Sequence, residues 1–186
     1  MIRRAFHLGL AMTVLTFMAG ASGFVRSAAA EASVDAFYGS YAGSATLERA
    51  DGSSEDRDMS VEIGPTKDGF NVKWVSISYK NDGRKKEKAY SIDFIPSMRD
   101  GIYSAAMTRN VFGHAVPLDP MNGEPFVWGR IDGDTMTVFS LFLSDNGDYE
   151  FQQFDRTLSD GGLMLDFSYF RQGQLQRSVS TLLARQ

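Results

Sequence analysis

The sequence predicts an all-β protein in which antiparallel strands form an up-and-down meander that closes into a barrel of eight to ten strands. The first observation is that Asp-Gly and Asn-Gly pairs, which supply the positive φ angles of tight hairpins, recur along the chain. Between them lie short runs rich in Val, Ile, Phe, Tyr, Thr and Ser that alternate in polarity. An open sheet of so many strands would leave two edges unpaired, and closure removes them. A two-sheet β-sandwich remains the alternative, since its turns have similar spacing. The turn signals are Asp51-Gly52, Asp68-Gly69, Asp82-Gly83, Asp100-Gly101, Asp132-Gly133, Asn146-Gly147 and Asp160-Gly161-Gly162.

Alternation also predicts which way the strands face. In the first strand Phe37, Tyr41 and Leu47 share one face with small residues, as a strongly bent strand requires. The seventh strand is apolar on both faces, which predicts that something covers its outer side. The last segment fits helical spacing as well, but its Ser, Val and Thr content favours a strand. The expected strands span residues 37–49, 57–64, 69–80, 85–95, 102–108, 126–132, 135–143, 149–158, 162–171 and 174–183.

The first thirty residues are predicted to be a cleavable signal peptide. Arg3 and Arg4 precede an apolar stretch from Leu8 to Phe17, which is too short to span a bilayer comfortably, and Ala28-Ala29-Ala30 forms an A-x-A cleavage site. An uncleaved N-terminal anchor would need a longer apolar segment. The expected location is therefore periplasmic or secreted, with residues 31–186 forming a single barrel domain.

Composition excludes several classes of function. Cleavage would remove three of the 19 basic residues and none of the 23 acidic ones, so the net charge would fall from −4 to −7. Such a chain is a poor partner for nucleic acid. The basic run 84–88 is expected to be a solvated hairpin tip, with an anionic headgroup or partner site as the alternative. The absence of cysteine excludes disulfides, thiol catalysis and zinc–thiolate sites, so a packed core must stabilise the fold.

Three polar segments are candidates for functional loops. Residues 109–125 hold three of the five prolines and are predicted to be a long loop, either a lid or a surface crossover. His114 lies in it and is the only histidine outside the signal peptide, so it alone could support catalysis, and no enzyme activity or catalytic residue is assigned. Residues 51–58 are expected to be a solvated loop. The segment from Asp145 to Asp148 resembles part of a calcium loop, but its glycine is misplaced, so neither a metal site nor a cofactor is predicted.

Aromatic residues suggest a ligand cavity. Many of them fall in predicted strands, and about half must point inward in a closed barrel, where they either fill a solid core or line a pocket for one small molecule. Arg130 or a tyrosine hydroxyl is expected to orient the polar end of the ligand. The candidate ligand-binding residues are Trp74, Tyr90, Phe94, Trp128, Arg130, Phe139, Phe167 and Tyr169.

Three short motifs resemble the lipocalin and wider calycin superfamily. Gly39-Ser40-Tyr41 is similar to its first-strand G-x-W signature, with tyrosine for tryptophan, and Asp148-Tyr149 is similar to its second motif. The family's late arginine, which packs over the first-strand aromatic residue and closes the barrel base, corresponds to Arg171, with Arg177 or Arg185 as substitutes. The resemblance implies a cup-shaped barrel that binds a small apolar or amphipathic molecule.

The leading functional hypothesis is an exported carrier or sensor of a small hydrophobic or amphipathic ligand. The alternative is a structural or assembly factor of the envelope, with a solid barrel that acts through a surface patch such as strand 135–143, bound to a second copy or to an envelope protein. An integral outer-membrane barrel is disfavoured, because charges such as Glu150, Arg156 and Asp166 are expected on the face opposite the apolar one.

Overall fold

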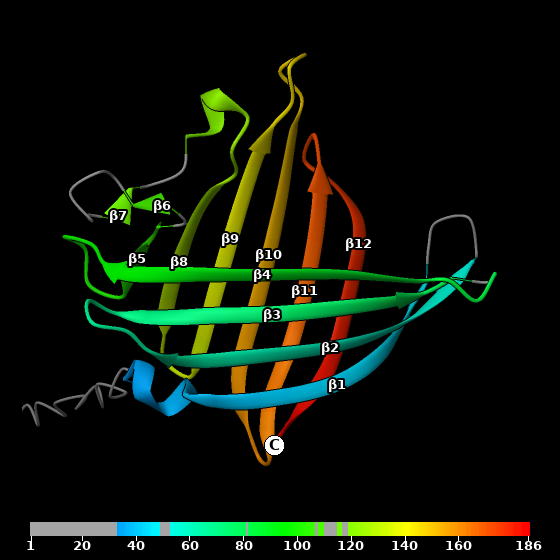
Figure 1. Ribbon diagram of the computed structural model, residues 1–186, viewed down its shortest axis with the longest axis horizontal. Helices are drawn as coiled ribbons and strands as arrows, with labels where there is room; N and C mark the ends of the chain where they lie inside the picture. The colour runs from blue at the N-terminus through cyan, green and yellow to red at the C-terminus, as the bar shows by residue number, and fades with distance from the viewer. Residues whose placement is uncertain (1–32, 49–52, 81, 107, 110–114, 117–118) are drawn as a thin grey trace, which may run out of the picture.

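The computed structural model describes residues 33–48, 53–80, 82–106, 108–109, 115–116 and 119–186, which form a closed antiparallel β-barrel (Figure 1). The predicted signal peptide and His114 lie outside the described residues. Neighbours around the barrel follow the order β1-β12-β11-β10-β9-β8-β5-β4-β3-β2, so the chain runs up and down and its last strand pairs with its first. The barrel strands are β1 (Gly39–Glu48), β2 (Ser54–Pro65), β3 (Phe70–Tyr79), β4 (Lys85–Pro96), β5 (Ile102–Ala106), β8 (Phe126–Asp132), β9 (Thr135–Leu143), β10 (Tyr149–Ser159), β11 (Gly162–Arg171) and β12 (Gln174–Arg185).

Four short elements complete the described chain. The 3-10 helix η1 (Val34–Phe37) precedes β1. Between β5 and β8 the chain forms a two-stranded sheet, β6 (Thr108–Arg109) with β7 (Ala115–Val116), followed by the 3-10 helix η2 (Pro120–Asn122). The described part of the predicted long loop therefore carries some regular structure of its own.

The predicted meander is confirmed, with three corrections at strand ends. The first strand begins at Gly39, because residues 34–37 form η1. The second begins at Ser54, so the polar segment predicted as a solvated loop already contributes to the barrel wall. The ambiguous last segment is a strand, and it continues to Arg185.

The two halves of the barrel cross each other. Figure 1 shows β1–β4 running across β8–β12 at a steep angle, with β9 and β10 extending beyond β4 in this view. One part of the wall is less complete: β4 pairs with β5 from Asp93 to Pro96, and among the described residues the first part of β4 has no partner strand on that side.

Closure depends on a close approach between β1 and β12. Tyr41 pairs with Arg185 and Ala42 with Ala184 across this seam. A Cβ atom on Gly43 would lie 2.5 Å from the carbonyl oxygen of Leu182, so only glycine lets the backbones come this close.

The half of the barrel interior beside the pairing of Tyr41 with Arg185, called the lower half from here on, is solid. Phe37 of η1 is fully buried, and Phe70 stacks on Phe94 with ring centroids 5.2 Å apart. The first-strand face predicted from alternation is confirmed at Tyr41 and Leu47, which are buried, whereas Phe37 is buried as part of η1. Dense packing here leaves room for a cavity only in the other half.

The seam provides a stability test. Gly43→Ala should destabilise the protein by about 1–3 kcal/mol, because the new methyl group must push β12 away. Gly64→Ala is the matched control, since nothing lies within 4 Å of its added Cβ, and it should be neutral or slightly stabilising. Urea denaturation of both variants measures the difference. Equal free energies of unfolding for the two variants would show that β1 and β12 can move apart without loss of stability.

Candidate functional site

An arginine stacked on a tyrosine closes the lower end of the barrel. The Arg185 guanidinium lies 4.9 Å from the centroid of the Tyr41 ring. It donates hydrogen bonds to the Tyr41 hydroxyl (2.7 Å) and to the carbonyl of Tyr38 (3.0 Å), while the Tyr41 hydroxyl donates to the carbonyl of Phe37 (2.9 Å). This contact ties the last strand to the first and to η1.

The predicted closing residue Arg171 does not make this contact. It lies at the hairpin between β11 and β12, where its guanidinium forms an ion pair with Glu150 (2.6 Å). The end of β11 that lies beside the Tyr41 seam is Gly162, nine residues away, or about 30 Å at the rise of a strand. The role expected of Arg171 therefore belongs to Arg185.

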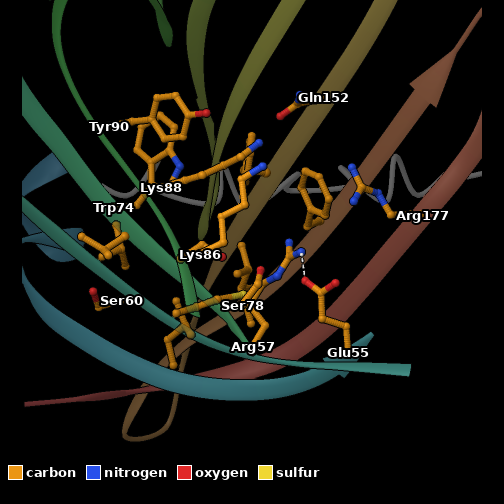
Figure 2. Close-up of a pocket in the computed structure, with 18 of the residues that line it drawn as sticks. Glu55, Arg57, Ser60, Trp74, Ser78, Lys86, Lys88, Tyr90, Gln152 and Arg177 are labelled. Atoms are coloured by element: carbon orange, nitrogen blue, oxygen red, sulfur yellow. Dashed lines mark hydrogen bonds and ion pairs between the residues drawn. The ribbon is translucent and has the colours of Figure 1, made fainter. Parts of the chain in front are cut away.

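Above the solid core lies a cavity of about 210 Å³ that opens on the other half of the barrel (Figure 2). Its aromatic wall is continuous: Trp74 stacks on Tyr90 (5.2 Å between centroids) and contacts Phe154 (5.7 Å), which in turn contacts Phe167 (4.7 Å). Aliphatic side chains such as Leu165 cover the floor. An apolar molecule would find flat, rigid surfaces on this wall.

A second cavity, of about 230 Å³, shares this wall. Trp74, Tyr90 and Phe154 contribute to both cavities, and the second extends toward Pro125 and Phe142 at the opposite rim. The aromatic side chains therefore separate two parts of the hollow half of the barrel.

Arg156 is the most unusual residue of the site. Its side chain is only 2% exposed, and its guanidinium lies 5.8 Å from the Trp74 ring centroid and 5.5 Å from that of Phe154. Burial lowers the pKa of Arg156 to about 10, against the opposing effect of Asp155, so the group is charged at neutral pH. Its Nε and Nη1 atoms are buried without a hydrogen-bond partner among the described residues.

The remaining charges of the cavity are predominantly positive. Glu55 is 5% exposed and accepts hydrogen bonds from Arg57 (3.1 Å) and Lys80 (2.9 Å). Burial by itself raises the pKa of Glu55, but hydrogen bonds from Lys80, Ser78 and Arg57 outweigh it and lower the pKa to about 2. Lys86, Lys88 and Arg177 complete the lining, and Figure 2 shows them around the cavity. Six cationic side chains thus face one carboxylate, in a chain whose net charge is −4.

Of the predicted ligand-binding residues, Trp74, Tyr90 and Phe167 line the cavity. Tyr169 is buried nearby, under the guanidinium of Arg177 (4.9 Å). Phe94 belongs to the solid core below.

Trp128, Arg130 and Phe139 are not brought to the cavity. Val127 and Ile131 of β8 are buried in the core, so alternation turns Trp128 and Arg130 outward, and buried Met136 and Val138 of β9 do the same for Phe139. The polar residues Arg130 and Asp132 were the available sequence signal for β8, whereas β9 is apolar on both faces.

The outer side of β8–β11 instead carries a row of five aromatic rings, which we call the outer aromatic row. Each ring contacts the next, with centroids 4.8 to 6.2 Å apart. The outer face of β9, which is expected to be covered, therefore lies partly under the rings of neighbouring strands. The row consists of Phe126, Trp128, Phe139, Phe151 and Phe170.

Sequence reasoning missed the charged residues of the cavity. Arg156 and Glu150 are expected on the outer face, yet Arg156 follows Phe154 at a spacing of two and shares its inward face, and Glu150 lines the second cavity. The expected loop at residues 51–58 hid Glu55 and Arg57, which belong to β2. Their alternation with Met59 was the available signal.

The described residues contain no cluster of three or more histidine or acidic side chains able to hold a metal ion, and no helix among them is long and apolar enough to cross a membrane. A search against known families and curated proteins finds no match for the chain. The fold and the site define the protein as a closed ten-stranded antiparallel β-barrel, solid at one end and hollow at the other.

The buried carboxylate predicts a pH dependence. A folded-state pKa of about 2 means that ionised Glu55 stabilises the protein above its unfolded pKa, near 4.5, and that this contribution is lost as the pH falls toward 2. Glu55→Gln should cost on the order of 2 kcal/mol at pH 7 and flatten the decline in stability between pH 5 and 2. Glu62→Gln, at an exposed position of β2, is the control. Urea denaturation measures the free energy of unfolding at each pH. If it declined in parallel for wild type and Glu55→Gln as the pH falls, this role of Glu55 would be contradicted.

Proposed function

We propose that the protein is an exported carrier or sensor that binds one small amphipathic molecule inside its barrel, in the manner of lipocalin-like and other calycin proteins. The observation that carries this proposal is the division of the barrel interior. A core of tightly packed side chains fills the end closed by Tyr41 and Arg185, and a cavity of about 210 Å³ occupies the other. A protein that used its barrel only as a scaffold would gain stability by filling that space.

The lining of the cavity supports the amphipathic character of the ligand. Trp74, Phe154 and Phe167 offer apolar surface, and burial of a ligand against it contributes about 25 cal/mol per Å². Gln152, Ser78 and the cationic side chains offer polar contacts beside that surface. Preformed sites of this mixed kind are typical of small-molecule binding.

The arginine stacked on the first-strand tyrosine supports the family resemblance. In lipocalins the late arginine is expected over the aromatic residue of the first strand, and here Arg185 lies over Tyr41. The ten-stranded topology fits the wider calycin group better than an eight-stranded lipocalin.

A variant that fills the cavity tests the proposal. Ser76 faces the cavity from β3, and Ser76→Phe should weaken binding of the neutral fluorescent probe N-phenyl-1-naphthylamine at least about tenfold, because the ring takes the space of the ligand. Ile77→Phe, on the outer face of the same strand, is the matched control and should bind like wild type. The proposal fails if the wild-type protein does not bind the probe, or if both variants bind it equally well.

The outer aromatic row favours a second candidate function, a structural or assembly role in the envelope. Contiguous apolar surface of this kind often marks a contact with another protein. If this candidate is correct, in-cell cross-linking should trap one dominant partner, either a second copy or an envelope protein. The double variant Trp128→Ser, Phe139→Ser should abolish that product while the cavity still binds the neutral probe. A chain that remains monomeric and without cross-links would exclude this role.

A further inference from the structure

A buried, charged guanidinium with unpartnered N–H groups is costly. Arg156 is 2% exposed, and neither Nε nor Nη1 has a hydrogen-bond partner among the described residues. Removing a charge from water costs several kcal/mol unless an opposite charge and hydrogen bonds compensate. The stacking of the guanidinium on Trp74 and Phe154 returns only part of that cost.

The carboxylates near Arg156 are already engaged elsewhere. Asp155, its neighbour on β10, accepts hydrogen bonds from Thr137 (2.6 Å) and Gln153 (2.7 Å) on the outer side of the barrel. Glu55, the carboxylate that lines the cavity, is held by Arg57 and Lys80. Asp155 thus acts on Arg156 through its charge but makes its hydrogen bonds elsewhere, and an anion in the cavity would supply acceptors for the unpartnered Nε and Nη1 atoms.

We propose that Arg156 binds the acid group of an amphipathic anion, which enters the cavity with its charged head first. This inference rests on the function proposed above and names the class of ligand. A carboxylate or phosphate monoester presents two acceptor oxygens that match the N–H donors of one guanidinium edge. Trp74, Phe154 and Phe167 then contact the apolar part that follows the head.

The surrounding charges favour the same ligand class. Lys86, Lys88 and Arg177 line the cavity, and the two lysines are exposed. Their potential attracts an anion to an otherwise acidic protein and repels a cation of the same shape. Arg156 supplies specificity, because it is shielded from solvent. The exposed lysines increase the rate of association, and salt weakens this effect.

Three probes with the same alkyl chain test the inference on the wild-type protein. Decanoate, decanol and decylamine compete with N-phenyl-1-naphthylamine for the cavity, and decanoate should bind about 30-fold more tightly than decanol, with decylamine weakest. Decyl phosphate, as a fourth probe, distinguishes a carboxylate from a phosphate ligand, and preference for either over decanol supports the proposal. Equal binding of decanoate, decyl phosphate and decanol would overturn the anion inference and leave the proposed function intact. Failure of every probe, including the naphthylamine, would overturn both.

Variants assign the preference to one residue. Arg156→Met keeps the length of the side chain without its charge and should reduce the preference of decanoate over decanol to about threefold or less, with binding of decanol retained. Arg130→Met, the same substitution at an exposed position outside the cavity, is the control and should keep the preference. If Arg156→Met does not fold, Arg156→Lys is measured instead, and it should lose most of the preference, because an ammonium lacks the planar fork. A preference unchanged in the Arg156 variant would overturn the assignment.

Discussion

Pairing between the first and last strands is the contact on which the rest of the barrel depends. The strands β1 and β12 lie at opposite ends of the described chain, so their pairing closes a loop that contains every other strand and carries a large entropic cost. Gly43 lets the two backbones approach, and the contact between Arg185 and Tyr41 fixes which residues face each other. Without this seam the same strands would form an open sheet with two free edges and an exposed apolar face. The solid core and the cavity both exist because the seam holds.

The two halves of the interior differ because their inward residues differ. In the lower half the inward positions carry compact apolar side chains such as Ile63, Val72 and Leu163, which interdigitate without gaps. In the upper half the same strands present Arg57, Ser78 and other polar groups, which cannot pack densely without losing their hydrogen bonds. The hollow therefore follows directly from the change in residue type along each strand.

The features that could be predicted from the sequence are those that depend on residues close together in the chain. Gly-containing turns and alternation revealed every barrel strand, because hairpin geometry depends on residues adjacent in sequence. The position of Arg185 opposite Tyr41 depends on register across the closing seam, which no local pattern encodes. The expected face of Arg156 is wrong because alternation assumes that charges point to solvent, and the interior of this barrel breaks that rule. Trp128 shares its face of β8 with the exposed Arg130 and Asp132, which indicate an outward orientation.

The chain has two tryptophans, and the barrel wall separates them. Trp74 lies in the cavity beside the guanidinium of Arg156, whereas Trp128 lies in the outer aromatic row between Phe126 and Phe139. Indole emission depends on its immediate electrostatic surroundings, so the intrinsic fluorescence of the protein is the sum of two signals from opposite sides of one wall. A molecule inside the barrel would alter the emission of Trp74, and contact with the outer face would alter that of Trp128. Two single-tryptophan forms of this protein would thus report separately, without any attached dye, on what happens inside the barrel and on its surface.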